Sequence, residues 1–234
     1  MKIAEVYASL QGEGRLAGTP SVFVRTSGCN LRCHWCDTPF TSWQPEGINR
    51  DISELAAEVR RYGCGHVVIT GGEPLIAASI NELCQRLRDT GHHITLETAA
   101  THLPPEGPPA VDLMSLSPKL ASSTPDASHG RWHIRHEETR RRDEVICQLM
   151  QADAYQLKFV IDTPDDLDET IAWLGDLGIM SNTRESRHVY LMPQGTAVGD
   201  LDEKQRWLHM ACQKHGFRFC RRHHIDWFGN TRGS

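Results

Sequence analysis

The sequence contains no long apolar segment. No stretch of its 234 residues approaches the roughly 20 consecutive apolar residues that a helix needs to cross a bilayer. Its first 14 residues, MKIAEVYASLQGEG, hold one lysine, and glycines stand where the apolar core of an export signal would require leucines. We therefore expect neither a membrane partner nor export. The protein should lie in the cytoplasm, where cysteine thiols stay reduced.

Excess positive charge is also missing. The 25 lysines and arginines are outnumbered by 30 aspartates and glutamates, so there is no overall basic field to attract nucleic acid. The compact basic clusters, Arg140–Arg142 and Arg221–Arg222, are typical of solvated helix surface. Neither an internal repeat nor a linker divides the chain, and its 39% hydrophobic content is ordinary for a globular protein. We predict a single domain over residues 1–234 and no nucleic-acid partner.

Apolar segments rich in β-branched residues alternate with amphipathic ones. The first kind predicts strands at 21–27, 66–70, 93–98, 111–117, 155–162 and 188–193. The second kind predicts helices at 51–62, 76–90, about 137–152, 164–177 and 200–215. Segments 103–110 and 121–135 have no apolar period and are expected to be irregular surface. The alternation predicts an α/β fold with a mostly parallel sheet, shortened to a partial β/α barrel because about six strands cannot form a barrel of eight.

Capping residues mark several helix ends. Asp51 precedes one apolar repeat, and Thr163 followed by Pro164 suits the start of another. Four glycines stand where a left-handed residue would end a helix: Gly63, Gly91, Gly178 and Gly216.

Three of the eight cysteines are grouped. Cys29, Cys33 and Cys36 have C-x3-C-x2-C spacing directly after a predicted strand. Three thiolates on one short loop can bind three corners of an iron–sulfur cubane and leave the fourth iron open for a chelating ligand. A zinc site completed by His34 or a distant histidine remains the alternative, although zinc requires a fourth ligand. The five scattered cysteines are expected to be small buried hydrophobic residues: Cys64, Cys84, Cys147, Cys212 and Cys220.

A second motif follows the next predicted strand. Thr70-Gly71-Gly72-Glu73-Pro74 places two glycines where the backbone can approach a ligand closely. Together with the cysteine spacing, this segment resembles the radical S-adenosylmethionine (SAM) superfamily. The resemblance implies a [4Fe-4S] cluster on Cys29, Cys33 and Cys36, and SAM bound to the open iron with its amino group near the TGGEP segment.

Further segments narrow the resemblance. The chain resembles the 7-carboxy-7-deazaguanine synthase (QueE) family in segments that extend over nearly its whole length: Tyr7–Gly14, Arg25, Asp37-Thr38, 96–98, Ser117-Pro118-Lys119, 192–194 and 227–233. That family consists of lyases of queuosine biosynthesis, usually homodimers on a shortened β/α barrel. They convert 6-carboxy-5,6,7,8-tetrahydropterin to 7-carboxy-7-deazaguanine and release ammonia. An electron donor such as flavodoxin would reduce the cluster.

The family's site residues map onto matching positions of this chain. The resemblance implies substrate contacts from Leu10, Gln11, Gly12, Arg25, Thr70 and Glu97, with Arg25 on the substrate carboxylate. It implies SAM contacts from Trp35, Cys36, Asp37, Gly72, Glu73, Ser117, Pro118, Lys119, Met192, Pro193, Gln194 and Gly195. Thr38 would place a hydroxyl oxygen on a magnesium ion, a hard cation that prefers oxygen ligands.

Two other functions fit part of the pattern. A glycyl-radical activase of the same superfamily shares the cysteine spacing and the GGEP segment, but it has no need of a carboxylate-binding Arg25. A zinc-binding or electron-transfer module would use the cysteines only to fold a loop. Turnover of the pterin with reductant and SAM separates all three.

Overall fold

The protein is built on one mixed sheet. The structure, a computed structural model, describes residues 1–233. Its strands are β1 (Lys2–Leu10), β2 (Pro20–Thr26), β3 (Ile48–Asn49), β4 (His66–Gly71), β5 (His93–Thr98), β6 (Leu113–Leu116), β7 (Tyr155–Ile161), β8 (Val189–Pro193) and β9 (Arg218–Phe219). They form a nine-stranded sheet in the order β3-β1-β2-β4-β5-β6-β7-β8-β9. Strands from β2 to β9 in this order are parallel, and β1 and β3 are antiparallel additions at one edge.

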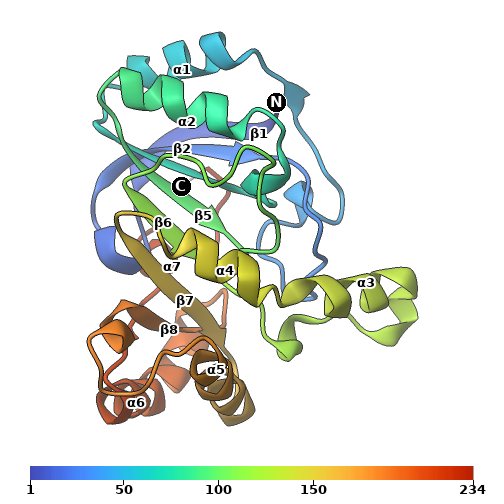
Figure 1. Ribbon diagram of the computed structural model, residues 1–234, viewed down its shortest axis with the longest axis vertical. Helices are drawn as coiled ribbons and strands as arrows, with labels where there is room; N and C mark the ends of the chain where they lie inside the picture. The colour runs from blue at the N-terminus through green and yellow to red at the C-terminus, as the bar shows by residue number, and fades with distance from the viewer. Residues whose placement is uncertain (234) are drawn as a thin grey trace.

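Helices pack against the outer side of the sheet (Figure 1). They are α1 (Ile52–Arg61), α2 (Ile80–Asp89), α4 (Asp143–Leu149), α5 (Pro164–Asp176) and α6 (Val198–His215), and two further helices, α3 (Arg131–Arg140) and α7 (His223–Phe228), lie elsewhere. Short 3₁₀ turns lie at Gly14–Leu16, Pro39–Thr41, Pro74–Ile76, Ala121–Ser123, Ala127–His129 and Glu185–His188. Helix α3 projects from the side of the body in Figure 1. Within residues 1–233, no helix has the length and apolar character that a bilayer crossing requires.

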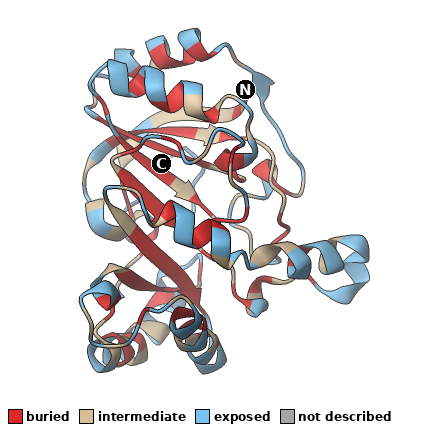
Figure 2. Cartoon of the chain, viewed as in Figure 1, coloured by how far each residue is buried: buried red, intermediate tan, exposed pale blue. Residues whose placement is uncertain are grey.

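The two faces of the sheet have different chemistry. Residues such as Val24, Ile69 and Leu96 point outward and form the main apolar core with the helices (Figure 2). Their neighbours Arg25, Thr70 and Glu97 point to the other side, because side chains alternate along a strand. One face of the sheet therefore borders a polar interior, and the other face packs against the apolar core.

The predicted architecture is confirmed. Each of the six predicted strands is present, the sheet is mostly parallel, and it remains open between β3 and β9 within the described residues. Sequence reasoning missed β1, β3, β9 and α7. Strand β1 was missed because most of its residues are only half-buried, so it lacks the apolar run that identified the central strands.

Two predictions for residues 121–152 were wrong. The expected helix at 137–152 is two helices, because Arg141 and Arg142 take non-helical conformations between α3 and α4. There the Arg141 guanidinium lies 4.9 Å from the centre of the Trp173 ring and bonds to Asp143 and Asp176. The expected irregular segment at 121–135 already enters helix α3 at Arg131.

The predicted helix caps are confirmed. Asp51 accepts hydrogen bonds from the backbone N–H groups of Ser53 and Glu54, and Thr163 forms a capping box with Asp166. The four helix-ending glycines have the positive φ angles that the prediction requires: Gly63 (70°), Gly91 (82°), Gly178 (77°) and Gly216 (70°). Of the five scattered cysteines, Cys84, Cys212 and Cys220 are buried as expected, whereas Cys64 is half-buried and Cys147 is exposed, so for these two the expectation was wrong.

His66 gives the fold a pH dependence. Its Nδ1 lies 2.5 Å from Ser21 Oγ and its Nε2 lies 2.9 Å from Thr95 Oγ1. Burial, and secondarily the nearby His93, lowers the pKa of His66 to about 4. The unfolded chain binds this proton near an ordinary histidine pKa of about 6.5, so between these values it binds more protons than the folded chain. We expect the free energy of unfolding to fall as pH drops from about 6.5 to 4.

Urea unfolding of the wild type and of His66→Gln across this pH range tests the expectation. The difference in unfolding free energy between the two proteins should shrink as pH falls, because glutamine does not titrate. A difference that stays constant with pH would show that His66 does not carry the effect.

Candidate active site

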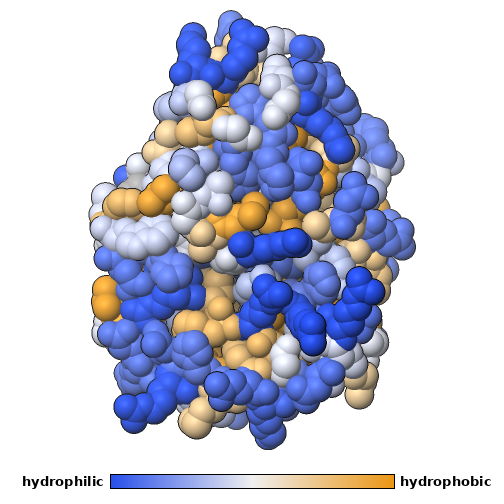
Figure 3. Space-filling view, turned by 90° about the vertical axis from the view of Figure 1, so that its left-hand side faces the viewer, coloured by the Kyte–Doolittle hydropathy of each residue, from blue (hydrophilic) through white to orange (hydrophobic). Residues whose placement is uncertain are grey.

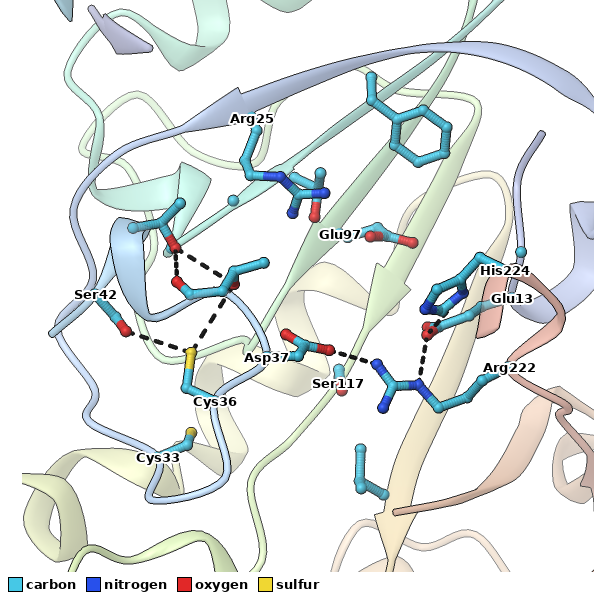
Figure 4. Close-up of a pocket in the computed structure, with 18 of the residues that line it drawn as sticks. Glu13, Arg25, Cys33, Cys36, Asp37, Ser42, Glu97, Ser117, Arg222 and His224 are labelled. Carbon is cyan, nitrogen blue, oxygen red and sulfur yellow. Dashed lines mark hydrogen bonds and ion pairs between the residues drawn. The ribbon is translucent and has the colours of Figure 1, made fainter. Parts of the chain in front are cut away.

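One cavity of about 340 Å³ opens where the parallel strands end. Parallel strands bring their carboxyl ends to the same edge, so residues distant in sequence meet there. Figure 4 shows the cysteine loop on one side of this cavity and Arg25, Glu97 and Arg222 around the other. Seventeen predicted site residues line it: Leu10, Gln11, Gly12, Arg25, Cys29, Cys33, Trp35, Cys36, Asp37, Thr38, Thr70, Gly72, Glu97, Ser117, Lys119, Met192 and Gln194.

Four predicted site residues do not line the cavity: Glu73, Pro118, Pro193 and Gly195. Glu73 is buried and accepts hydrogen bonds from Leu75 N, Thr98 Oγ1 and Ala99 N at 2.7–3.0 Å. It ties the segment after β4 to the end of β5. The Gly195 carbonyl accepts a 2.6 Å hydrogen bond from Arg222 Nη1, so its backbone anchors a cavity arginine.

The three grouped cysteines follow β2 on a loop that forms the cavity wall. Leu31 N–H donates to Cys29 Sγ at 3.4 Å, and Cys36 Sγ lies 3.3 Å from Ser42 Oγ. Burial raises the pKa of Cys29 and of Cys33 to about 12. These two thiols would therefore become thiolates when a bound metal supplies compensating positive charge.

The donor set fits a cluster better than a single ion. Three thiols from one loop face the same cavity. Across residues 1–233, no three His, Cys, Asp or Glu side chains meet closely enough to bind one metal ion. His34, the proposed zinc ligand, is exposed. A cubane takes one cysteine at each of three corners and leaves its fourth iron open, so three thiols from one loop match the number of ligands that it needs.

Gly72 brings the second motif into contact with the cysteine loop. A Cβ at Gly72 would lie 2.0 Å from the Gly28 carbonyl oxygen and 2.8 Å from that of Thr41. The Gly28 carbonyl accepts a 2.9 Å hydrogen bond from Glu73 N–H, and Gly28 N–H donates to the Thr41 carbonyl at 2.8 Å. The glycine is therefore needed to seat the loop that carries the cysteines.

We expect Gly72→Ala to weaken cluster retention. The added methyl group cannot fit against the Gly28 backbone, so the loop must shift at a cost of about 1–3 kcal/mol. Iron and sulfide content after anaerobic reconstitution measures the effect. Gly65→Ala, before the same strand, is the matched control because nothing lies within 4 Å of its added Cβ. Equal iron content in the two variants would contradict the expectation.

Arg25 presents one free edge to the cavity. Its Nε donates to Glu5 Oε1 at 2.7 Å, and its Nη2 donates to Tyr7 Oη at 2.9 Å. Within residues 1–233, its Nη1 has no hydrogen-bond partner. Nη1 and the second hydrogen of Nη2 can therefore donate two hydrogen bonds to one carboxylate.

A buried lysine joins two cavity carboxylates. Lys158 Nζ lies 2.9 Å from Glu13 Oε2 and 3.3 Å from Glu97 Oε1, and Gln11 Nε2 also donates to Glu97 Oε1 at 3.3 Å. Burial alone would raise the pKa of Glu13, but Lys158 and Arg222 outweigh it and hold that pKa well below its usual range. Burial would likewise lower the pKa of Lys158, whereas Glu13 and Glu97 raise it. Glu13 and Lys158 therefore both stay ionised around neutral pH.

Arg222 was missed as a cavity residue. The sequence placed Arg221 and Arg222 on a solvated surface, and for Arg222 this was wrong, because it is buried and lines the cavity. It forms a short ion pair with Asp37, and its Nε lies 3.3 Å from Glu13 Oε1. Burial would raise the pKa of Asp37, but Arg222 lowers it. No local pattern signals this contact, since the partners are 185 residues apart.

The C-terminal segment completes the wall. His224 lies so close to Gly12 that a Cβ there would be 2.5 Å from His224 Nδ1. Arg232 lies 3.8 Å from the centre of the Phe40 ring and bonds to Glu5 and Glu46 at 2.9 Å each. Sequence analysis assigned neither His224 nor Arg232 to the site. The close contact at Gly12 explains a glycine where a strand has just ended.

Comparisons with known proteins agree on one chemistry. The Radical SAM superfamily profile matches residues 23–118. A 7-carboxy-7-deazaguanine synthase of Rhodopirellula baltica is 48% identical over 234 residues, covering 99% of this chain and 88% of that protein. The protein of the same name from Halobacterium salinarum is 44% identical, covering 96% of this chain and 89% of its own.

Solved structures give the same fold. The crystal structure of QueE from Escherichia coli matches with a TM-score of 0.68 at 24% identity, covering 94% of this chain and 92% of that one. At that identity the match concerns the fold, and it agrees with the open, mostly parallel sheet described above.

Proposed function

The chain belongs to the 7-carboxy-7-deazaguanine synthase family of radical SAM enzymes, and from this premise we propose how its cavity serves the reaction. It is a lyase of queuosine biosynthesis that contracts the ring of 6-carboxy-5,6,7,8-tetrahydropterin to 7-carboxy-7-deazaguanine and releases ammonia. One observation carries the proposal. The cysteine loop and the free edge of the Arg25 guanidinium line the same small cavity.

Cys29, Cys33 and Cys36 would hold the [4Fe-4S] cluster of the superfamily. SAM bound beside it would supply the radical chemistry that acts on the substrate. Lys119 offers a cation that Ser117 fixes, since Nζ donates to the Ser117 carbonyl and hydroxyl at 2.8 and 2.9 Å. Apolar contacts for SAM would come from Trp35, Val160 and Met192, which line the cavity and pack on Tyr190 and Cys220 behind them. SAM contacts are also proposed for Cys36, Asp37, Gly72 and Gln194.

The substrate would lie between Arg25 and Glu97. The free fork of Arg25 suits the carboxylate of the pterin. Glu97 Oε2 has no hydrogen-bond partner within residues 1–233, and it suits the guanidine-like edge of the same molecule. The Glu97 carboxylate, with Oε1 3.3 Å from Lys158 Nζ, has two oxygens that can accept two N–H groups. Leu10, Gln11, Gly12 and Thr70 complete the proposed substrate wall.

Anaerobic turnover tests the function directly. Reconstituted protein with dithionite, SAM, magnesium and 6-carboxytetrahydropterin should form 7-carboxy-7-deazaguanine, detected by mass spectrometry. SAM cleavage without this product would keep the radical chemistry and refute the substrate. The proposal also includes a homodimer in the cytoplasm and a reduced electron carrier such as flavodoxin as partner.

Thr38 is the proposed magnesium ligand. Its Oγ1 faces the cavity between Cys36 and Thr41, at 3.9 Å from Cys36 Sγ and 3.4 Å from Thr41 Oγ1. A hydroxyl beside a bound carboxylate fits Mg²⁺, which commonly combines one or two protein oxygens with substrate and water. We expect Thr38→Val to raise the magnesium concentration for half-maximal turnover about tenfold, as for loss of about 1.4 kcal/mol.

A magnesium titration of turnover measures this effect. Thr139→Val on α3 makes the same change outside the cavity and should leave the titration unchanged. If both variants required the same magnesium as the wild type, Thr38 would not be a ligand.

A further inference from the structure

The segment 121–140 forms the outer wall of the cysteine loop. Arg32 N–H donates to His136 Nδ1 at 3.1 Å, and His34 N–H donates to the Ser123 carbonyl at 3.0 Å. Ser123 Oγ lies 2.9 Å from His136 Nε2, and both side chains are fully buried. The helix that projects from the body in Figure 1 is therefore fixed to the backbone between Cys29 and Cys36.

The same segment gathers three arginines around one indole. The guanidinium carbons of Arg32, Arg135 and Arg131 lie 3.8, 5.3 and 5.7 Å from the centre of the Trp132 ring. Arg32 is buried beneath the ring, whereas Arg131 and Arg135 are exposed. We call Arg32, Arg131, Trp132 and Arg135 the Trp132 face. Its Arg32 lies in the cysteine loop itself, next to Cys33.

The Trp132 face is a local reversal of charge. The whole chain carries a net charge of −5. Within residues 1–233, neither Arg131 nor Arg135 forms an ion pair with a carboxylate. Of the nearby acids, Glu137 bonds to Arg140 at 3.0 Å, Asp126 accepts a hydrogen bond from the Ser128 backbone, and Glu138 is exposed one turn along α3. Two unpaired arginines beside an aromatic ring thus face solvent on an otherwise acidic molecule.

We propose that the Trp132 face docks a small acidic electron carrier of the flavodoxin type, which passes one electron to the cluster. The donor is oxidised from hydroquinone to semiquinone, and the cluster is reduced by the same electron. This inference rests on the proposed function, since it requires the cluster on Cys29, Cys33 and Cys36. It deepens that function by assigning the partner a surface.

Geometry and charge favour this face over the cavity mouth. A cavity of about 340 Å³ holds small molecules and cannot admit a protein, and the substrates would fill it during turnover. Behind the cysteines, the loop is covered on this side by the segment 121–140. Opposite charges on the partners raise association rates and are screened by salt over a Debye length of about 10 Å at 0.1 M. Opposite charge attracts an acidic carrier to the Trp132 face, which lies directly against the cysteine loop through Arg32.

Charge reversal of the two exposed arginines tests the proposal on cluster-loaded protein. We expect Arg131→Glu/Arg135→Glu to slow stopped-flow reduction of the cluster by flavodoxin hydroquinone at least about tenfold at low salt, with the difference shrinking as salt rises. Reduction by dithionite, which needs no docking surface, should be unchanged. Arg60→Glu/Arg61→Glu, a matched pair of exposed arginines on α1, should behave like the wild type.

Binding gives a readout independent of reduction. Chemical shifts of ¹⁵N-labelled oxidised flavodoxin titrated with cluster-loaded protein should report weaker binding to the α3 variant than to the α1 variant. Unchanged binding and reduction would overturn the proposal, and so would equal slowing with flavodoxin and dithionite, because the face would then act on the cluster itself. If the wild type bound RNA and Arg131→Glu/Arg135→Glu lost that binding while it still bound flavodoxin, the face would be a nucleic-acid surface and the proposal would be overturned.

These outcomes are distinct from failure of the proposed function. Wild-type protein that is reduced by flavodoxin through this face but forms no deazaguanine would refute the substrate and support the docking surface. Wild-type protein that forms deazaguanine with dithionite would support the proposed function, and unchanged reduction of Arg131→Glu/Arg135→Glu by flavodoxin would then refute the docking surface alone.

Discussion

Replacing Cys33 by alanine is expected to abolish product formation while leaving the chain folded. Cys33 is one of three free thiols on the loop, and its removal leaves two thiolates where the cluster needs three. Without the cluster the whole catalytic acceleration is lost, at least about 10⁶-fold, which puts product below detection. Cleavage of SAM should disappear with it.

Anaerobic mass spectrometry of both products, together with iron and sulfide content, measures this result. Cys147→Ala is the matched control, because Cys147 is exposed on α4 and away from the cavity. It should retain iron, SAM cleavage and product. Product from Cys33→Ala would show that Cys33 is not a required cluster ligand, whereas a colourless wild-type protein loaded with zinc would support the zinc-binding alternative.

The fold could be predicted because the outer face of the sheet is apolar. Central strands such as β4 and β7 are buried on both sides, so they form apolar runs that periodicity detects. Strand β1 escaped detection because it carries Glu5 and Tyr7 into the polar interior. The break between α3 and α4 was not predictable, since it depends on Arg141 packing against Trp173, a tertiary contact.

The site could be predicted where its residues adjoin one another in sequence. Three cysteines within eight residues and the TGGEP segment carry their chemistry in their spacing. Arg222 and Lys158 have no such motif around them. Each is a single basic residue whose role comes from carboxylates far away in the chain, Asp37 and Glu13, which folding brings into contact. Such long-range ion pairs leave no periodic or local signature.

Glu73 shows the opposite case. Its place in a recognised motif suggested contact with SAM. In the structure its carboxylate is used by three hydrogen bonds within the chain, and burial raises its pKa. The Glu73 side chain thus stabilises the segment after β4, and Gly72 is the residue that lies close to the Gly28 backbone of the cysteine loop.

Arg25→Ala is expected to weaken binding of the carboxylated substrate, and of that substrate selectively. Removing a charged, two-fold hydrogen-bonding partner costs about 2–5 kcal/mol, which corresponds to an affinity loss of about 30-fold to 4000-fold. Calorimetry with 6-carboxypterin, a stable oxidised analogue, measures it. Pterin without the carboxylate should bind the wild type and the variant equally. Arg25→Lys should recover only part of the affinity, because an ammonium lacks the planar fork.

A control variant distinguishes loss of substrate binding from a general effect of removing an arginine. Arg86→Ala on α2 removes an exposed arginine that pairs with Glu82 across one helical turn, and it should leave binding unchanged. Glu5 keeps a partner in Arg25→Ala, since Arg232 also bonds to it at 2.9 Å. A glycyl-radical activase binds a peptide and needs no carboxylate fork, so full activity of Arg25→Ala would favour that alternative. Equal loss for both pterins would assign Arg25 to the shape of the cavity instead of to the carboxylate.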